Sequence, residues 1–318
     1  MMNEARMAGA LLALDRIVIL THRRPDGDTV GSAAALCLGL RQKGKQAWVL
    51  KNPQLTEKYS PWLEGLCCDE IPRGASLVSV DVAAEDMLLK GLPENAEIVL
   101  AIDHHGTNSG YAKQSLVRPE RAACGEIIYD VLKSMDVEIT KDMAAALYVA
   151  LSTDTGCFRY SNVTENTFRV AAELLRTGVE VYPINRSLFE IKRYARLKLE
   201  AYLTESMAFY SENRIGICCI PHALREELGL TEDDVDDISG FARMIEGVEI
   251  AAMLRQLPDE GVKISLRTDR CFDAGAICKS LGGGGHVCAA GASVRGTPEE
   301  ATSALLQAIY TYYPELKD

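Results

Sequence analysis

Histidine and aspartate are concentrated in a few short stretches of the chain, the first of which lies near the N-terminus. It spans His22 to Asp28 and reads His-Arg-Arg-Pro-Asp-Gly-Asp. One imidazole and two carboxylates in so short a stretch suit a divalent metal ion, because Pro and Gly let the loop turn its side chains toward one point. An exposed turn followed by a helix-capping aspartate accounts for the same residues. For this stretch alone the two interpretations have about even weight.

Three further acidic groups accompany apolar segments. Asp81 and the run Asp103-His104-His105 each follow a stretch rich in Val, Ile and Leu, and Asp154 ends an apolar helical stretch. Asp81 or Asp154 alone is more often a turn or capping residue, whereas two adjacent imidazoles after an apolar strand have no simple packing explanation. Of the five histidines, only His222 lies outside these groups and a glycine-rich loop near the C-terminus.

The surrounding elements predict that these groups meet. From Arg16 to about Ala150, short apolar runs alternate with helical stretches, the pattern of a parallel α/β sheet. Strands are expected at Ile17 to Leu20, Ala47 to Leu50, Leu77 to Val80 and Ile98 to Ile102, and helices at Thr29 to Lys43, Cys124 to Met135, Lys141 to Ser152 and Glu165 to Thr177. Ligands bind outside the carboxyl ends of such strands, so residues that follow them converge on one crevice.

Six residues form the predicted metal site: His22, Asp26, Asp28, Asp81, His104 and Asp154. Four carboxylates with two imidazoles suit Mn²⁺ or Mg²⁺ better than structural Zn²⁺, which favours thiolates in paired spacing. Two ions ~3.5–4 Å apart stabilise both the attacking and the leaving oxygen of an in-line phosphoryl displacement. The site therefore predicts a two-metal phosphoesterase.

The second half of the chain predicts a smaller, separate α/β domain. Ser187 to Glu212 contains no Gly or Pro and interleaves charged with apolar residues, as one long amphipathic helix would. We expect a helical linker at 187–212 to join a catalytic domain, residues 1–186, to a substrate-binding domain, residues 213–318. Strands of the second domain are expected at Ile215 to Ile220, Val248 to Leu254 and Val262 to Leu266, with a last helix from about Pro298 to Tyr310.

A run of four glycines ends in His286 and follows a helical stretch from Asp273 to Leu281. Such a run lets backbone N–H groups approach an anion closely, and His286 adds a donor. A flexible linker is the alternative, with a weight of about one in four, because apolar structure flanks the run on both sides. No Lys-Ser/Thr pair follows, so the run is not a P-loop. Arg255 and Arg267 end or follow strands of the same domain, and guanidinium groups suit phosphate.

Composition limits the partners. The net charge of −11 argues against a grip on long duplex nucleic acid, so a nucleotide substrate should be short. Ten cysteines without C-x-x-C spacing suggest a reducing cytoplasm. The longest uncharged apolar runs, such as Ala144 to Leu151, are far too short to span a bilayer, and we expect no membrane partner.

At this point the sequence resembles the DHH phosphoesterase family. The four family motifs appear in order as His22-x-x-Pro25-Asp26-x-Asp28-x-x-Gly31-Ser32, Asp81, Asp103-His104-His105 and Asp154-Thr155-Gly156. Gly282 to His286 together with Ala289 to Ala292 resembles the signature of the associated C-terminal domain. The closest group is the standalone nanoRNase and pAp phosphatase enzymes. Thr21 and the basic pair Arg23-Arg24 depart from the usual pattern, but neither change touches a ligand position.

The resemblance implies two Mn²⁺ ions, with Mg²⁺ or Co²⁺ as alternatives, and assigns their ligands. His22 and Asp26 would hold one ion, Asp28, His104 and Asp154 the other, and Asp81 both. Asp103 would support the ligands, and His105 would contact phosphate or donate a proton, so Asp81, Asp103 and His105 are the expected catalytic residues. The second domain would bind substrate across a cleft. Its expected contacts are Arg255, Arg267, Gly283, Gly284 and His286.

The function expected from this pattern is hydrolysis of short RNA or DNA oligonucleotides, linear dinucleotides such as pApA, or the 3′-phosphate of pAp, by a hydroxide that two metal ions activate. One alternative is a pyrophosphatase or polyphosphatase with the same first domain. A second is a nucleotide-binding regulatory module without catalysis. A homodimer is compatible with the pattern, which does not fix the oligomeric state.

Overall fold

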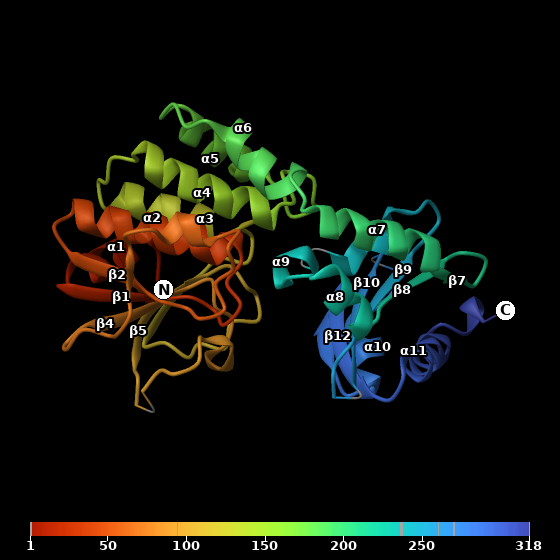
Figure 1. Ribbon diagram of the computed structural model, residues 1–318. Helices are drawn as coiled ribbons and strands as arrows, with labels where there is room; N and C mark the ends of the chain where they lie inside the picture. The colour runs from red at the N-terminus through yellow and green to blue at the C-terminus, as the bar shows by residue number, and fades with distance from the viewer. Residues whose placement is uncertain (1, 94, 236–237, 260, 270, 318) are drawn as a thin grey trace. The chain divides into compact units, whose positions relative to one another are not determined.

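The computed structural model describes residues 2–93, 95–235, 238–259, 261–269 and 271–317. The chain divides into two compact units, Met1–Ile191 and Lys192–Asp318, and each contains a six-stranded sheet (Figure 1). Buried apolar side chains form clusters on both faces of each sheet, so each unit has its own core.

The sheet of the N-terminal unit has the strand order β3-β2-β1-β4-β5-β6, and all neighbouring strands are parallel. The strands are β1 (Arg16–Leu20), β2 (Gln46–Leu50), β3 (Cys67–Cys68), β4 (Ser76–Val80), β5 (Ile98–Asp103) and β6 (Gln114–Val117). The chain first adds β2 and β3 on one side of β1, and β4 then starts on the other side. A crevice forms at such a reversal, outside the carboxyl ends of the two central strands. The ends of β1 and β4 are therefore where this fold positions a ligand site.

Helices cover one face of this sheet, and in Figure 1 α2, α3 and α4 lie above it. The helices are α1 (Glu4–Leu12), α2 (Gly27–Gln42), α3 (Cys124–Ser134), α4 (Lys141–Asp154), α5 (Glu165–Leu175) and α6 (Val181–Asn185), followed by a π-helix at Arg186–Glu190, and two 3-10 helices lie at Ser60–Leu63 and Glu85–Met87. Ile17 and Ile19 of β1 pack in the same cluster as the helices, whereas Val18 and Leu20 pack in a cluster on the other face. Burial on both faces explains why β1 is apolar from Ile17 to Leu20.

Glycine lets α2 approach α4 closely. A Cβ atom added to Gly31 would lie 2.2 Å from the carbonyl oxygen of Ala146, and one added to Gly27 would lie 2.4 Å from the side chain of Thr153. A side chain at Gly31 would collide with backbone, which cannot rotate away, so this position requires glycine. The close packing places the first turn of α2 against the last turn of α4.

The sheet of the C-terminal unit is mixed and has the order β11-β12-β10-β9-β8-β7. Its strands are β7 (Ala208–Tyr210), β8 (Ile215–Ile220), β9 (Ile250–Gln256), β10 (Gly261–Thr268), β11 (Gly284–His286) and β12 (Ala289–Arg295). Strands β8 and β9 are parallel, and the other neighbours are antiparallel. Strand β10 alternates buried and half-buried residues, so one of its faces lies in the core and the other is more open.

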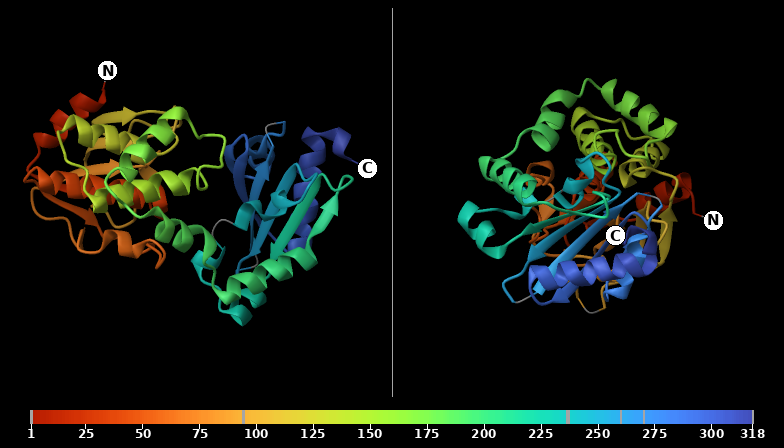
Figure 2. Two further views of the ribbon diagram at one scale, coloured as in Figure 1. Left: turned by 90° about the horizontal axis from the view of Figure 1, so that it is seen from above. Right: turned by 90° about the vertical axis from the view of Figure 1, so that its right-hand side faces the viewer.

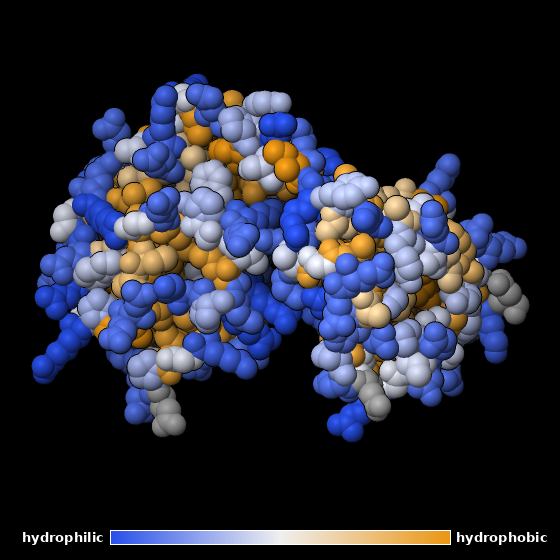
Figure 3. Space-filling view, in the orientation of Figure 1, coloured by the Kyte–Doolittle hydropathy of each residue, from blue (hydrophilic) through white to orange (hydrophobic). Residues whose placement is uncertain are grey.

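Helices pack on both faces of this second sheet. They are α7 (Tyr194–Ser206), α8 (His222–Leu228), α9 (Glu232–Val235), α10 (Ala274–Ser280) and α11 (Pro298–Tyr312), with 3-10 helices at Ile238–Met244 and Pro314–Leu316. Leu305 and Ile309 of α11 pack against one face, and α11 lies along the strands in Figure 2. Leu199 and Leu203 of α7 pack against the other. Mostly polar residues cover the visible surface of each unit (Figure 3). None of the helices formed by the described residues combines the length and apolar character needed to cross a membrane.

The predicted α/β class with two sheets is confirmed, and each predicted strand of the first sheet is present to within one residue at either end. The single helix predicted from Ser187 to Glu212 is wrong in its extent. Ile191 and Arg193 have extended backbone, so helical structure is interrupted before α7 begins at Tyr194. After α7, residues 208–210 pair with β8, and residues 211–213 have positive φ. Pairing with β8 supplies the backbone hydrogen bonds that a longer helix would have supplied.

Candidate metal centre

The loop between β1 and α2 carries His22 and Asp26, and the first turn of α2 carries Asp28. Asp26 is the N-cap of α2, where its Oδ1 accepts hydrogen bonds from the backbone N–H groups of Asp28 (3.1 Å) and Thr29 (3.2 Å). The same Oδ1 lies 3.6 Å from Nε2 of His22. The capping role and the position beside an imidazole therefore coincide in one carboxylate.

Asp28 is buried at the start of α2, with 1% of its surface exposed. Its Oδ1 accepts hydrogen bonds from the Ser32 hydroxyl (3.1 Å) and the N–H of Gly125 (2.9 Å), and Oδ2 accepts one from the N–H of Cys124 (2.6 Å). Cys124 and Gly125 begin α3, so the carboxylate meets the positive ends of two helices. These contacts fix its orientation and leave the second lone pair of Oδ2 for a cation.

Asp81 directly follows β4 and has a positive φ of 58°. Its N–H donates to the carbonyl oxygen of Ile102 on β5 (2.9 Å), so strand pairing holds the residue while its left-handed backbone turns the chain. The side chain is 3% exposed and faces two imidazoles. Oδ2 lies 3.8 Å from Nε2 of His22, and Oδ1 lies 3.4 Å from Nε2 of His104.

Asp103 ends β5, and the two histidines that follow it are each held through one ring nitrogen. Nδ1 of His105 lies 2.7 Å from Oδ1 of Asp103, and Nδ1 of His104 lies 3.2 Å from the carbonyl oxygen of Arg121. Asp103 is fully buried and also accepts a hydrogen bond from Nδ2 of Asn108 (2.7 Å). Because Nδ1 of each ring is held by a protein acceptor, Nε2 is the nitrogen that is left for a metal ion or a substrate.

The last predicted ligand, Asp154, is the final residue of α4, and its Oδ2 lies 3.6 Å from Nε2 of His104. The structure thus brings all six predicted ligands together. Their ligand atoms fall into groups that lie within 4.8 Å of one another, namely His22 with Asp26 and Asp81, Asp28 with His104 and Asp154, and Asp81 with His104 and His105. His22, Asp26 and Asp81 are called the His22 group, and Asp28, His104 and Asp154 are called the Asp154 group. Asp81 faces both.

The charges of the site strongly disturb its proton equilibria. Burial raises the pKa of Asp28 well above its usual range, and the charges of Asp81 and Asp154 add to this effect. Burial, followed by the charge of Asp81, raises the pKa of Asp154 to about 7. For His104, burial alone would lower the pKa, but the contacts with Asp81 and Asp28 raise it to about 11. Without cations, burial and mutual repulsion therefore favour proton binding by these carboxylates, and the carboxylates stabilise the charged form of the His104 imidazole.

The chemistry of the donor set fits divalent cations. Among the residues that the structure describes, Oδ1 of Asp81 is a buried oxygen without a hydrogen-bond partner, although buried carboxylate oxygens are normally satisfied. A cation between Asp81 and His104 would satisfy it. The mixture of carboxylates and imidazoles, without a thiolate in any of the three groups, is the set that Mn²⁺ or Mg²⁺ prefers.

The predicted substrate contacts lie in the C-terminal unit, where strand register gathers them on one face of the sheet. Arg255 on β9 pairs with Lys263 on β10, and Arg267 lies four residues farther along β10, so both arginines project from one face. His286 on β11 pairs with Ala289, which pairs with Arg267. Arg267 and His286 therefore stand in one row across the sheet, with only a small side chain between them.

The second half of the glycine run, Gly284 and Gly285, forms an edge strand with His286, so the run is not a flexible linker. A Cβ atom added to Gly283 would lie 2.1 Å from the carbonyl oxygen of Gly291, and one added to Gly285 would lie 2.5 Å from Cα of Ala290. Gly284 and Gly285 pair with β12 in β11. Close approach of two backbones thus explains the glycines at 283 and 285. Gly284 has open space where a Cβ would lie.

Sequence reasoning missed three asparagines that hold the site. Asn108 donates to Asp103 and also to the carbonyl oxygen of Val82 (3.2 Å). Asn52 and Asn162 donate to the main chain of His22 and Asp154. Asn52 follows β2 by two residues, so the strand-end rule that found the ligands applies to it as well.

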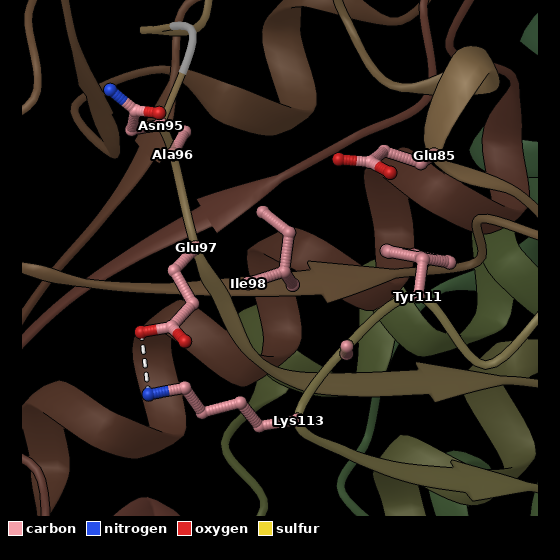
Figure 4. Close-up of a pocket in the computed structure, with 8 residues that line it drawn as sticks. Glu85, Asn95, Ala96, Glu97, Ile98, Tyr111 and Lys113 are labelled. Atoms are coloured by element: carbon pink, nitrogen blue, oxygen red, sulfur yellow. Dashed lines mark ion pairs between the residues drawn. The ribbon is translucent and has the colours of Figure 1, made fainter.

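An open pocket of about 540 Å³ lies elsewhere in the N-terminal unit (Figure 4). Its lining includes Ile98, the first residue of β5, and Glu97 and Lys113, which form an ion pair of 2.5 Å. The proposed ligands His22, Asp81 and His104 follow the opposite ends of the strands. The pocket is therefore separate from the candidate metal centre.

Comparison with known proteins identifies the family. The DHH family, N-terminal domain, matches residues 16–151, and the DHHA1 domain matches residues 217–313. The chain is 36% identical to the bifunctional oligoribonuclease and PAP phosphatase NrnA of Thermus thermophilus, over 92% of this chain and 89% of that protein. It is 24% identical to the protein of the same name from Bacillus subtilis, over 88% of this chain and 90% of that one.

A solved structure of an exopolyphosphatase-related protein from Bacteroides fragilis superposes with a TM-score of 0.85 at 24% identity, and covers 99% of this chain and 98% of that one. At this identity the likeness establishes the shared fold. The matches over both units and the extent of the Thermus thermophilus relative show that this chain belongs to the DHH family.

Proposed function

We propose that this protein is a two-metal phosphoesterase, with Mn²⁺ as the favoured ion. It hydrolyses short oligonucleotides and linear dinucleotides such as pApA to mononucleotides, and it removes the 3′-phosphate of pAp. The observation that carries the proposal is the position of Asp81, whose two carboxylate oxygens face His22 and His104 respectively. Cations bound on both sides of this carboxylate would activate water and neutralise charge on the reacting phosphoryl group.

Each residue of the centre has a role in this proposal. His22 and Asp26 hold one ion, Asp28, His104 and Asp154 hold the other, and Asp81 is shared. The free Nε2 of His105 faces substrate, where it donates a hydrogen bond or a proton to a phosphate oxygen. Asp103 keeps the ring in that orientation through Nδ1.

The proposed substrate rests on the C-terminal unit and on the relatives. Arg255, Arg267 and His286 project from one face of the sheet, and guanidinium groups suit phosphate oxygens. Gly283 and Gly284 lie at the adjoining edge strand. Relatives over nearly the whole chain carry the names oligoribonuclease and PAP phosphatase. The net charge of −11 favours short substrates, and ten free cysteines support a reducing, cytoplasmic setting.

One assay tests the proposal. Purified protein is stripped of metal, reloaded with Mn²⁺, and incubated with pAp, pApA, cyclic dinucleotides, longer RNA and DNA, and pyrophosphate, with products resolved by length. We expect pAp and pApA to yield AMP only when metal is present. Turnover of pyrophosphate alone would favour a pyrophosphatase. Saturable binding of pApA without turnover at any divalent metal would favour a regulatory module.

A further inference from the structure

Two asparagine side chains hold the main chain of proposed metal ligands, one on each side of the centre. Nδ2 of Asn52 donates hydrogen bonds to the carbonyl oxygen of His22 (2.8 Å) and to the Thr21 hydroxyl (3.0 Å). Nδ2 of Asn162 donates to the carbonyl oxygens of Asp154 (3.0 Å) and Ala122 (3.1 Å). Each amide therefore joins the backbone of a ligand to a second atom nearby.

Asn162 completes the support of the Asp154 group. Ala122 belongs to the segment 121–125, whose Arg121 carbonyl oxygen contacts Nδ1 of His104 and whose last two N–H groups donate to Asp28. This one segment thus orients two ligands of the group. By bonding to both Ala122 and Asp154, Asn162 ties the third ligand to the same segment.

The segment itself is anchored away from the metal ligands. The Arg121 guanidinium lies 2.9 Å from the carboxylate of Asp130 and 3.7 Å from the carboxylate of Glu126. Glu126 is fully buried. Glu126 accepts further hydrogen bonds from Asn166 and Thr167 at the start of α5. The segment is therefore a fixed support to which Asn162 can hold Asp154.

Asn52 has the corresponding place beside the His22 group. It is 6% exposed, and its Oδ1 accepts a hydrogen bond from the N–H of Gln54 (2.9 Å), so both ends of the amide are engaged. Thr21 and His22 are the two residues that connect β1 to the metal-binding loop. A bond to both of them fixes the point at which this loop leaves the sheet.

We propose that Asn52 and Asn162 are positioning residues, and that each sets the metal affinity of one ligand group: Asn52 that of the His22 group and Asn162 that of the Asp154 group. The inference rests on the proposed two-metal function. A shift of a ligand weakens metal binding because the bonds depend on ligand geometry, and loss of an outer partner costs ~10–100-fold in metal affinity. Each substitution should therefore weaken one ion and spare the other.

Calorimetric titration of the metal-free protein with Mn²⁺ provides the first test. Wild type should bind two ions. Asn162→Ala should bind one of them ~10–100-fold more weakly with the other unchanged, whereas the control Asn185→Ala, which removes a bond to Tyr148 in the same unit, should bind both as wild type does. Asn162 is exposed, so its variant should fold, and circular dichroism verifies this. For the buried Asn52, Asn52→Ser keeps a hydroxyl donor and provides a milder second variant.

Double substitutions assign each asparagine to its group. In an Asp154→Asn background the Asp154 group is already impaired, so adding Asn162→Ala should have little further effect on Mn²⁺ binding, whereas adding Asn52→Ala should weaken the remaining ion. Two tight ions in Asn162→Ala, or equal weakening of both ions, would overturn this inference alone. Binding of fewer than two ions by wild type would overturn the two-metal function and this inference with it.

Discussion

Nδ1 of His105 lies 2.7 Å from Oδ1 of Asp103. This contact raises the pKa of His105, because the buried carboxylate stabilises the charged ring more than burial disfavours it. In turn, the hydrogen bonds from His105 and Asn108 keep the pKa of Asp103 below its usual range despite burial. The pair therefore holds an oriented ring with its second nitrogen free.

Replacement of Asp103 by asparagine tests this relationship. The amide is nearly the same size but lacks the charge, so His105 loses its strongest acceptor and its pKa should fall. We expect kcat for pApA to drop by ~10–100-fold, the range for loss of an outer partner. The alkaline limb of the pH–rate profile, on which the protonated ring of His105 is lost, should move to lower pH. Unchanged kcat at unchanged Mn²⁺ content would show that His105 needs no orientation.

Asp81 should be the most sensitive of the six ligand positions, because it alone lies in both the His22 group and the triad that contains His104 and His105. Asp81→Asn is expected to weaken both ions and to lower kcat/KM by more than ~100-fold, beyond the range for an outer partner. The measurements are Mn²⁺ stoichiometry by calorimetry and turnover of pApA. Asp86→Asn, at an exposed carboxylate five residues away, should change neither. Retained turnover in Asp81→Asn would contradict the shared role of Asp81.

Sequence alone predicted that the proposed ligands lie close together, because residues that follow neighbouring parallel strands meet at one edge of the sheet. Continuous apolar runs such as Ile17 to Leu20 predict strands buried on both faces, and residues after such strands meet at one edge. His22, Asp81 and His104 all obey this rule. Asp154 does not, because it ends a helix, and only close packing of α2 on α4 brings it to Asp28.

Other features depended on contacts that a sequence pattern does not contain. Asparagine is common in turns, so Asn52 and Asn162 do not stand out in the sequence. Only the fold shows that their amides reach the main chain of His22 and Asp154. Strand β12 was not predicted because its Ala-Ala-Gly-Ala start has low strand propensity and is stabilised by pairing with β10. The helix predicted from Ser187 to Glu212 ends at Ser206 instead, because residues 208–210 pair with β8.

The packing of α2 on α4 leads to a prediction about Gly31. In an unconstrained helix, alanine is more stable than glycine by ~1 kcal/mol. At this position a Cβ atom would lie 2.2 Å from the Ala146 carbonyl oxygen, so α2 must move and the overpacking should cost ~1–3 kcal/mol.

Chemical denaturation of Gly31→Ala measures this loss of unfolding free energy, and Mn²⁺ affinity should fall as well because Asp28 moves away from Asp154. Gly9→Ala in α1 is the matched control, since a Cβ there meets no atom within 4 Å. The control should be neutral or stabilising. Equal stabilisation of both variants would contradict the packing argument.

The proton equilibria of the metal-free centre predict how stability depends on pH. The pKa of Asp154 is raised to about 7 and that of His104 to about 11. At a pH between the ordinary and the raised pKa of either group, the folded chain therefore binds more protons than the unfolded chain. Stability changes with pH in proportion to the protons bound by the unfolded chain minus those bound by the folded chain. Because this difference is negative, the contribution of the centre falls as pH rises through neutrality. It is fully present only below the ordinary pKa of each group.

Divalent cations should reverse this loss, since they replace the protons and bind more tightly as the ligands become deprotonated. We expect the rise in Tm on addition of Mn²⁺ over EDTA-treated protein to be larger at about pH 8.5 than at about pH 6, with each 1 kcal/mol worth ~2–4 °C for a domain of this size. Scanning calorimetry measures the difference. Asp81→Asn should show a smaller dependence, because one carboxylate that raises the pKa of His104 is neutral. A metal-induced rise in Tm that is equal at both pH values in wild type would mean that Mn²⁺ does not displace protons from these ligands.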